Sequence, residues 1–129
     1  MKHYITKEQS EKLVELGIDT STADLSYRLC GDTYQLDIIP YKFASFINTP
    51  CWSLGALLAL ITKSENKEVS LSYDVFTKDW SCQYEDYNIE FYYNDAHDYD
   101  TLSHHITTSK NPIDAVFEMV VWLKENNCI

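Results

Sequence analysis

The stretch TPCWSLGALLALI, from Thr49 to Ile61, limits what this chain can fold into more than any other part of the sequence. Thr49 can cap a helix, and Pro50 suits a first helical turn, where its missing N–H costs no hydrogen bond. Gly55 within this segment indicates that a neighbouring element packs closely there. Four aliphatic residues recur with the spacing of one helical face: Leu54, Leu57, Leu58 and Ile61. The segment is too short to span a bilayer, so it predicts a central, largely buried helix over residues 50–62.

A short amphipathic helix is predicted near the N-terminus. Thr6 and Gln9 have the spacing of a capping box, in which each side chain bonds to the backbone N–H of the other residue. Gly17 suits the left-handed conformation that ends many helices, and Ile18 is placed to contact Leu13 across that end. The sequence thus predicts a helix that begins after Thr6 and stops before Gly17.

Alternation of apolar and polar residues predicts the strands. A hairpin is expected from Leu25–Leu29 and Tyr34–Ile38, which flank the turn sequence Gly31-Asp32-Thr33. Further strands are expected at residues 69–75, 80–84 and 89–93, with a weaker signal at 102–106. On the first of these strands the apolar set is Val69, Leu71, Tyr73 and Val75, and on the last it is Leu102, His104 and Ile106. Short polar turns at 77–79 and 86–88 favour an antiparallel meander.

A final helix is predicted from Asn111 and Pro112 onward, because Pro fits the first helical turn. Its broad inner face consists of Ile113, Val116, Phe117, Val120 and Leu123. The predicted order is α-β-β-α-β-β-β-α. Helices must cover the apolar face of the sheet, so we expect a two-layer α+β fold, in which an antiparallel sheet of about five strands has the helices packed on one face. The length suits one domain over residues 1–129.

Charge limits the classes of partner. Twenty acidic residues against ten basic ones give a net charge of −10, and Arg28 is the only arginine. Such a chain repels nucleic-acid phosphates and anionic membranes, so neither is expected as a partner. The first residues lack the apolar segment of a signal peptide, and the four cysteines show no disulfide or metal-binding spacing. We expect a cytoplasmic protein with reduced thiols and no cofactor; its oligomeric state is left open.

The most unusual composition lies between Asp79 and Asp100. This segment holds seven acidic residues and no Lys or Arg, and aromatic residues are interleaved with the acids. Carboxylates steer a basic partner toward a surface, and tyrosines supply contact area. We therefore predict a surface that binds a basic protein, formed by Glu85, Asp86, Tyr87, Glu90 and Tyr92. The alternative interpretation is a solvated sheet face whose charges protect the strand edges.

A metal site is a further hypothesis for this region. Asp95, His97 and Asp98 are potential ligands. An EF-hand loop that starts at Asp95 requires Gly at its sixth position and Glu at its twelfth, but Asp100 and Ile106 stand there. A zinc site would need two more ligands to converge on His97. No metal is therefore predicted.

The alternative function is a small enzyme with a pocket between sheet and helices. A helix N-terminus lowers the pKa of a nearby thiol, so Cys51, close to the predicted helix start, is a candidate nucleophile. A carboxylate pair such as Glu85 with Asp86 is a candidate for acid–base chemistry. The competing explanation is a buried structural Cys51 and a chance pair of acids in an acidic chain. We therefore predict no catalytic residue.

Three stretches together resemble a set of small uncharacterised proteins from intestinal bacteria and their prophages. They are ITKEQ at Ile5–Gln9 with LGIDTS at Leu16–Ser21, WSLGALL at Trp52–Leu58, and DAVFEMVVWL at Asp114–Leu123. The likeness runs from about Thr6 to the C-terminus and implies a shared fold, but it transfers no catalytic residue. An inhibitor, an immunity protein or an accessory protein of mobile DNA would fit both this resemblance and the acidic surface.

Overall fold

The computed structural model describes residues 2–38, 41, 48–63, 67–87 and 101–129, with the backbone alone at residues 87 and 101–103. In chain order its elements are α1 (Lys7–Glu15), the short 3-10 helix η1 (Thr20–Thr22), β1 (Leu25–Cys30), β2 (Thr33–Asp37), β3 (Thr49–Cys51), α2 (Leu54–Ile61), β4 (Lys67–Asp74), β5 (Asp79–Tyr87), β6 (Thr101–Ser109) and α4 (Pro112–Glu125). The described residues therefore form an α+β structure.

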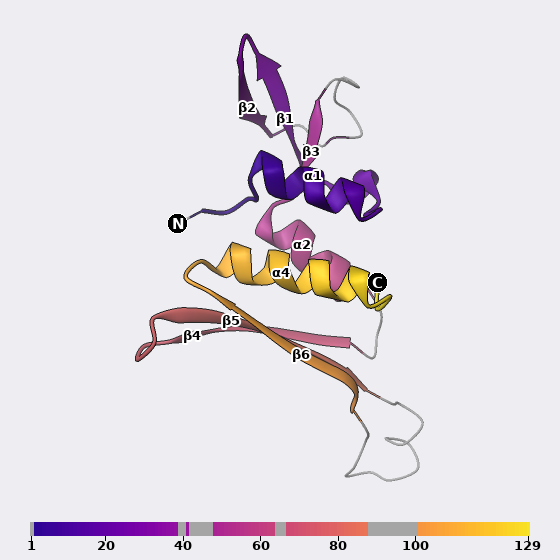
Figure 1. The fold of residues 1–129 in the computed structure, drawn as a ribbon, viewed down its shortest axis with the longest axis vertical. Coiled ribbons are helices and arrows are strands. Elements are labelled where there is room, and N and C mark those ends of the chain that lie inside the picture. Colours follow the sequence, from indigo (N-terminus) through magenta and orange to yellow (C-terminus); the bar gives the residue numbers. More distant parts are fainter. Residues whose placement is uncertain (1, 39–40, 42–47, 64–66, 88–100) are drawn as a thin grey trace.

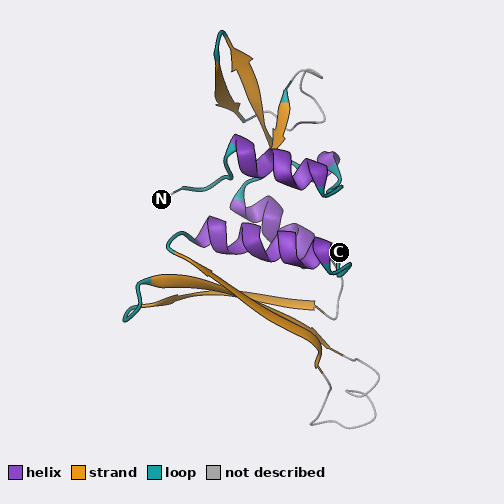
Figure 2. Ribbon diagram, viewed as in Figure 1, coloured by secondary structure: helices purple, strands orange, loops and turns teal. Residues whose placement is uncertain are grey.

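Two antiparallel three-stranded sheets lie at opposite ends of the described structure, with the helices between them (Figure 1). The first sheet has the strand order β2-β1-β3, and the second has the order β4-β5-β6. Helix α1 contacts β3, α2 contacts α4, and α4 covers one face of β5 and β6 (Figure 2). The α+β class and the antiparallel pairing are as predicted. A single sheet of about five strands and the order α-β-β-α-β-β-β-α are not confirmed, because β3 precedes α2 and the described strands divide into two sheets.

The helix predicted over residues 50–62 begins later than expected. Thr49 and Pro50 belong to β3, which pairs with β1 at the edge of the first sheet. Proline is tolerated on an edge strand, where no neighbour requires its N–H. The N-cap of α2 is Ser53, whose hydroxyl oxygen accepts a hydrogen bond from the N–H of Ala56 at 3.2 Å. The prediction that Thr49 caps this helix is therefore wrong.

Helix α2 also presents a different face to the core than its apolar pattern indicates. Leu57 and Ile61 are fully buried, whereas Leu58 is only partly buried. Gly55 is exposed, and a Cβ placed there would meet only the Ser53 hydroxyl, at 3.8 Å, among the described residues. The close packing predicted at Gly55 is thus wrong.

The first helix forms as predicted. The Thr6 hydroxyl accepts a hydrogen bond from the N–H of Gln9 at 3.1 Å, and the Gln9 side chain accepts one from the N–H of Thr6 at 2.9 Å. Gly17 has a φ of +86°, and the N–H of Ile18 donates to the carbonyl of Leu13 at 3.1 Å. This is the Schellman arrangement that the Gly17–Ile18 pair predicts.

The hairpin of β1 and β2 is confirmed. Cys30 pairs with Thr33, so Gly31 and Asp32 form a two-residue turn. Gly31 has a φ of +63°, a conformation that Gly adopts without the steric penalty of a side chain. The turn therefore follows from the local sequence.

In the second sheet, β5 is longer than predicted. It continues to Tyr87, so the turn expected at residues 86–88 is wrong at Asp86 and Tyr87. These two residues pair with β6 around a register shift. The strand predicted at residues 89–93 lies outside the described residues.

Strand β6 confirms the weaker signal at residues 102–106, but its inner face is the opposite of the expected one. Ile106 is 48% exposed, while His105 and Thr107 face α4. The Thr107 hydroxyl donates to the carbonyl of Ala115 at 2.5 Å, and the His105 ring stacks on Trp122 with centroids 4.0 Å apart. Polar residues occupy the inner face because α4 supplies their partners.

A continuous hydrophobic core joins the helices to both sheets. Helix α4, and not the helix that was predicted to be central, contributes most of the core residues. Its predicted inner face, formed by Ile113, Val116, Phe117, Val120 and Leu123, is buried together with Ala115 and Met119. Leu13 of α1, Leu57 of α2 and Tyr84 of β5 belong to the same cluster and are fully buried. In the described part of the chain, no helix combines the length and the apolar character that a bilayer crossing requires.

Candidate binding surface

The structure separates the residues predicted to form one acidic binding surface. Tyr84 of β5 is fully buried beneath the helices. Because side chains alternate between the two faces of a strand, Asp86 lies on the same face as Tyr84, and Glu85 lies on the opposite one. The two carboxylates therefore lie on opposite faces of the sheet. Of the other predicted residues, Tyr87 is the last of β5 and has its backbone described, while Glu90 and Tyr92 lie outside the described residues.

Asp86 lies on the core side of the sheet, near its end. The Tyr84 hydroxyl donates to the Asp86 carboxylate at 3.4 Å. Across the ladder, Asp86 is in register with Lys67 of β4. The Lys67 ammonium in turn donates to the carbonyl of Cys128, beyond α4. Asp86 thus belongs to the boundary between the sheet and α4.

Glu85 lies on the face of the sheet that points away from the helices. Its neighbours across the ladder are Glu68 of β4 and His104 of β6. The Gln83 side-chain amide donates to Glu85 at 3.0 Å, and His104 Nε2 is 3.8 Å from the same carboxylate oxygen. Two carboxylates directly opposite each other on a sheet repel, so this end of the face has a concentrated negative charge that a cation stabilises.

The rest of this outer sheet face carries small polar side chains. We define it as the outward positions of β4, β5 and β6: Glu68, Ser70, Ser72, Ser81, Gln83, Glu85, His104, Ile106 and Thr108. Ile106 is exposed near its middle, where Gln83 is its neighbour in register. No element within the described ranges covers this face, since the helices lie on the other side (Figure 1). The outer sheet face therefore offers an accessible polar surface with an acidic end.

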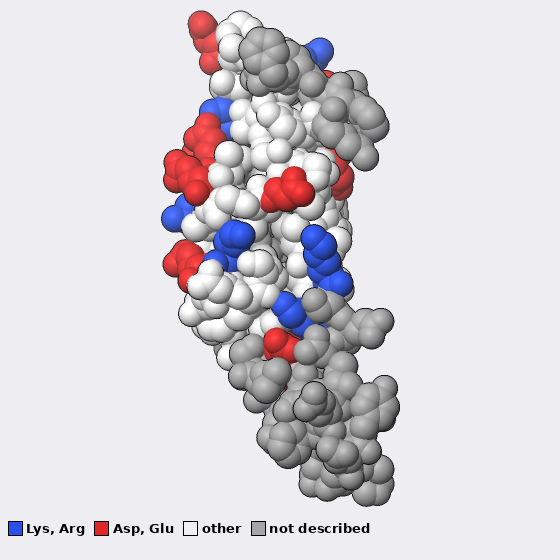
Figure 3. All heavy atoms as spheres, turned by 90° about the vertical axis from the view of Figure 1, so that its right-hand side faces the viewer, with Lys and Arg blue, Asp and Glu red and all other residues white. Residues whose placement is uncertain are grey.

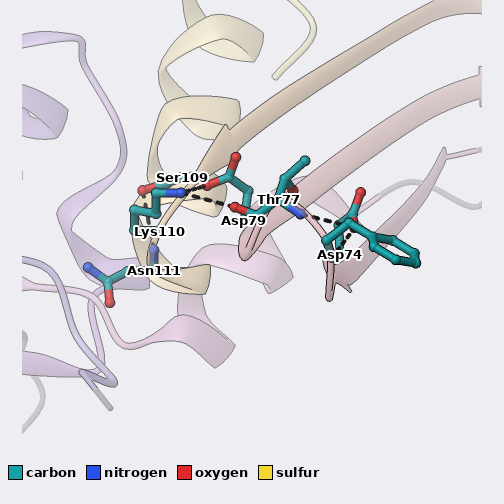
Figure 4. Close-up of polar contacts among 7 residues, drawn as sticks. Asp74, Thr77, Asp79, Ser109, Lys110 and Asn111 are labelled. Carbon is teal, nitrogen blue, oxygen red and sulfur yellow. Dashed lines mark hydrogen bonds and ion pairs between the residues drawn. The ribbon is translucent and has the colours of Figure 1, made fainter.

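The β4–β5 turn at the other end of the sheet was expected at residues 77–79, but it spans residues 75–78 and so begins two residues earlier. Val75 was assigned to the inner face of a strand, but it lies in the turn and is 68% exposed, next to Phe76 at 92%. The Asp74 carboxylate accepts hydrogen bonds from the N–H groups of Phe76 at 2.8 Å and Thr77 at 3.4 Å (Figure 4). An aspartate just before an apolar pair is the signal that could have indicated this turn.

An ion pair holds this turn against the start of α4. The Lys110 ammonium is 2.6 Å from the Asp79 carboxylate and donates to the carbonyl of Thr77 at 3.2 Å (Figure 4). Lys78 in the same turn has a φ of +60°, and its N–H donates to the Asp74 carbonyl at 2.8 Å. The exposed Phe76 is therefore presented by an ordered backbone.

Cys51, the candidate nucleophile of the alternative function, is fully buried in β3. Its thiol donates to the carbonyl of Ile5 at 3.5 Å, and burial raises the pKa of the Cys51 thiol to about 11. Cys82 of β5 is also fully buried, and burial raises its pKa to about 11. Both thiols are protonated at neutral pH and shielded from solvent, so the geometry opposes a catalytic thiolate at Cys51.

The metal hypothesis receives no support from the described part of the chain. No group of three or more His, Cys, Asp or Glu side chains within it converges as a metal site would require. The residues Asp95, His97 and Asp98, on which that hypothesis depended, lie outside the described residues. The four cysteines are free thiols.

No family model, no curated protein and no solved structure matches this chain.

Proposed function

We propose that the protein is a small cytoplasmic binding module that engages a basic protein partner through the outer sheet face. The observation that carries this proposal is the juxtaposition of Glu68 and Glu85 on an accessible sheet face lined by small hydroxyl side chains. Carboxylates on such a face attract lysine and arginine side chains of a partner and accelerate encounter. We propose that such a module acts as an inhibitor, as an immunity protein or as an accessory protein of mobile DNA.

Charge around the outer sheet face supports a basic partner. Its strands carry Glu68 and Glu85 at one end, and Asp74 and Asp79 at the other. Lys110 lies beside Asp79 and offsets one of these charges. The outer sheet face therefore has acidic residues at its two ends and mainly neutral polar residues between them. Tyr87 is the last residue of β5, and Glu90 and Tyr92 follow it in the sequence; these three stay part of the proposed surface as contact residues.

The free cysteines support the cytoplasmic location that we propose. All four are free, and Cys30 and Cys128 are partly exposed. Partly exposed free thiols are typical of proteins in a reducing compartment. A cytoplasmic location is thus the one that best suits the thiol chemistry of this chain.

The test compares two variants with the same net charge. Glu68→Gln/Glu85→Gln removes two charges from the outer sheet face, and Glu15→Gln/Glu118→Gln removes two exposed charges from α1 and α4. A partner captured by the parent from an extract of the native host is identified, purified and measured by surface plasmon resonance at low and high salt. We expect the first variant to associate several-fold more slowly at low salt and the second to behave like the parent.

High salt should abolish the difference between the two variants, because the effect is electrostatic. Equal association rates for both variants at low salt would rule out the outer sheet face as the binding surface. In that case the acidic segment from Asp79 to Asp100 is better explained as a solvated sheet face whose charges protect the strand edges.

A further inference from the structure

A hollow at the C-terminal ends of the helices is lined by more basic than acidic side chains, in contrast to the acidic composition of the chain as a whole. Its volume is about 310 Å³, and it lies where α1, α2 and α4 end and β4 begins. Lys63, Lys67 and Lys124 line it, with Asp19 as the acidic residue of the lining. We call this hollow the lysine pocket. Three of the ten basic residues thus surround one small space in a chain that has twenty acidic ones.

The lysine pocket opens on one face of the molecule. Figure 3 shows the side on which these helices end, and Lys and Arg side chains gather near the middle of that face. The three lysines come from different segments: Lys63 follows α2, Lys67 is the first residue of β4, and Lys124 lies in the last turn of α4. The tertiary fold therefore brings these charges together.

The positive charge of the lysine pocket is only partly matched by the protein. Ion pairs shorter than 4.0 Å within the described ranges use other cations, namely Lys7, Lys110 and His104. Lys67 donates to the carbonyl of Cys128, a neutral group. Asp19 accepts a hydrogen bond from the N–H of Ser21 at 3.0 Å, which occupies one of its oxygens. An anion in the pocket would find ammonium groups available as donors.

The other walls of the lysine pocket are apolar or carry a fixed hydroxyl. Ile18 and Leu60 supply the apolar surface. The Thr22 oxygen accepts a hydrogen bond from the indole N–H of Trp52 at 2.9 Å, and its hydroxyl donates to the carbonyl of Asp19 at 2.6 Å. Charged and apolar side chains in the lining of one small cavity are typical of a site for a small organic ligand.

We propose that the lysine pocket binds a small phosphate monoester, with the phosphate near the ammonium groups and the organic part against Ile18 and Leu60. Lysine is a common phosphate ligand because its ammonium acts as a mobile point charge. The volume is at the lower end of the range for ligand pockets, about 300–1,000 Å³, which favours a monoester over a nucleoside triphosphate. The proposal uses no residue of the outer sheet face and is independent of the proposed function.

Helix ends provide the competing explanation for the three lysines. The C-terminal ends of α2 and α4 carry partial negative charge, which Lys63 and Lys124 stabilise. Lys67 begins a strand, but its ammonium donates to the carbonyl of Cys128 just beyond α4, so it can stabilise that helix end as well. The two explanations differ in their consequences: a purely helix-stabilising role predicts a lower melting temperature for variants of these lysines, without any effect of phosphate on the parent protein.

The test is titration calorimetry with phenyl phosphate, inorganic phosphate and phenol. We expect phenyl phosphate to bind more tightly than inorganic phosphate, and phenol not to bind. Lys63→Gln/Lys124→Gln should weaken phenyl phosphate binding by at least about tenfold, since two charge-assisted contacts are lost. The control Lys12→Gln/Lys78→Gln removes the same charge elsewhere, and Lys12 also lies in the last turn of a helix. This control should bind as the parent does.

Thiol alkylation locates the ligand. Cys128 lines the lysine pocket, whereas Cys30 lies on β1 in the first sheet, and both are partly exposed. Phenyl phosphate should therefore slow alkylation of Cys128 by iodoacetamide and leave Cys30 unaffected. The proposal is overturned if phenyl phosphate at millimolar concentration does not bind the parent, or if both double variants bind it equally. Equal protection of the two thiols would overturn it as well.

Discussion

At the scale of single residues, the carbonyl of Ile5 organises a buried polar site between α1 and the first sheet. The Tyr27 hydroxyl donates to it at 2.5 Å, and the Cys51 thiol donates to it at 3.5 Å. Burial is the largest cause of the raised pKa of Tyr27 and of the raised pKa of Cys51. A buried carbonyl needs donors, so both groups are held in their protonated, donating forms.

The buried thiols of Cys51 and Cys82 should lower the free energy of unfolding at high pH. The folded-state pKa of Cys51 and of Cys82 is about 11, above the ordinary value of 9.0. A raised pKa means that the folded protein holds the proton more tightly, so the stabilisation is complete below pH 9 and is lost as pH rises toward 11. We expect the free energy of unfolding to drop by roughly 2 kcal/mol per thiol over this interval.

Urea unfolding at a series of pH values, followed by tryptophan fluorescence, measures this drop. Cys51→Ala should reduce the slope of the unfolding free energy against pH between pH 9 and 11. Cys30→Ala serves as the control for the loss of a thiol that is only partly buried. A slope that is the same in all three proteins would contradict the assignment to buried thiols.

At the scale of elements, α2 shows how tertiary contacts select among apolar residues. Leu57 and Leu58 are adjacent members of the same apolar pattern, but Leu57 is fully buried and Leu58 is only partly buried. Helix α2 contacts α4 and β4, and its exposed side carries Gly55 and Ala59. The side of α2 that faces α4 therefore determines which of the two leucines contributes more to the free energy of unfolding.

Alanine substitutions at Leu57 and Leu58 test whether the difference in burial produces a difference in stability. Leu57→Ala should cost about 2–5 kcal/mol of unfolding free energy, because it removes contacts and leaves a cavity. Leu58→Ala should cost clearly less, since part of its side chain already meets water. Chemical denaturation of the two variants provides the comparison. Equal losses, or a larger loss for Leu58→Ala, would contradict the burial that distinguishes them.

At the scale of the whole molecule, the two sheets depend on one core. Leu13 of α1, Trp52 before α2, and Tyr84 of β5 belong to the same buried cluster, although they lie far apart in the chain. The Gln9 side chain also donates to Asp114 at 2.9 Å and connects α1 to α4. Because a continuous core couples its elements, we treat the described structure as one cooperative unit.

Hydrogen exchange measures this cooperativity. Leu13→Ala, made in α1, should increase the exchange of β5 amides in the distant second sheet by about the same factor as that of β1 amides. Leu57→Ala, made between the sheets, should affect both strands in the same way. Faster exchange confined to β1 in the Leu13→Ala protein would show that the two sheets unfold independently.

The sequence by itself determined the elements whose partners lie within a few residues. The Thr6–Gln9 capping box, the stop at Gly17 and the turn at Gly31 all form as predicted. The inner face of α4, around Val116 and Val120, is also correct. Each of these depends on backbone geometry and on helical spacing, which the local sequence contains.

The tertiary structure decided what depends on distant partners. Pro50 lies in an edge strand because β1 pairs with it, and α2 starts at Leu54 because Asp24 and Ser53 form its cap. Composition indicated the acidic character of β5, but pairing with β4 and β6 placed Glu85 outward. The lysine pocket gathers residues from three segments. Contacts between residues far apart in the chain leave no periodic signal in the sequence, so only the folded structure reveals them.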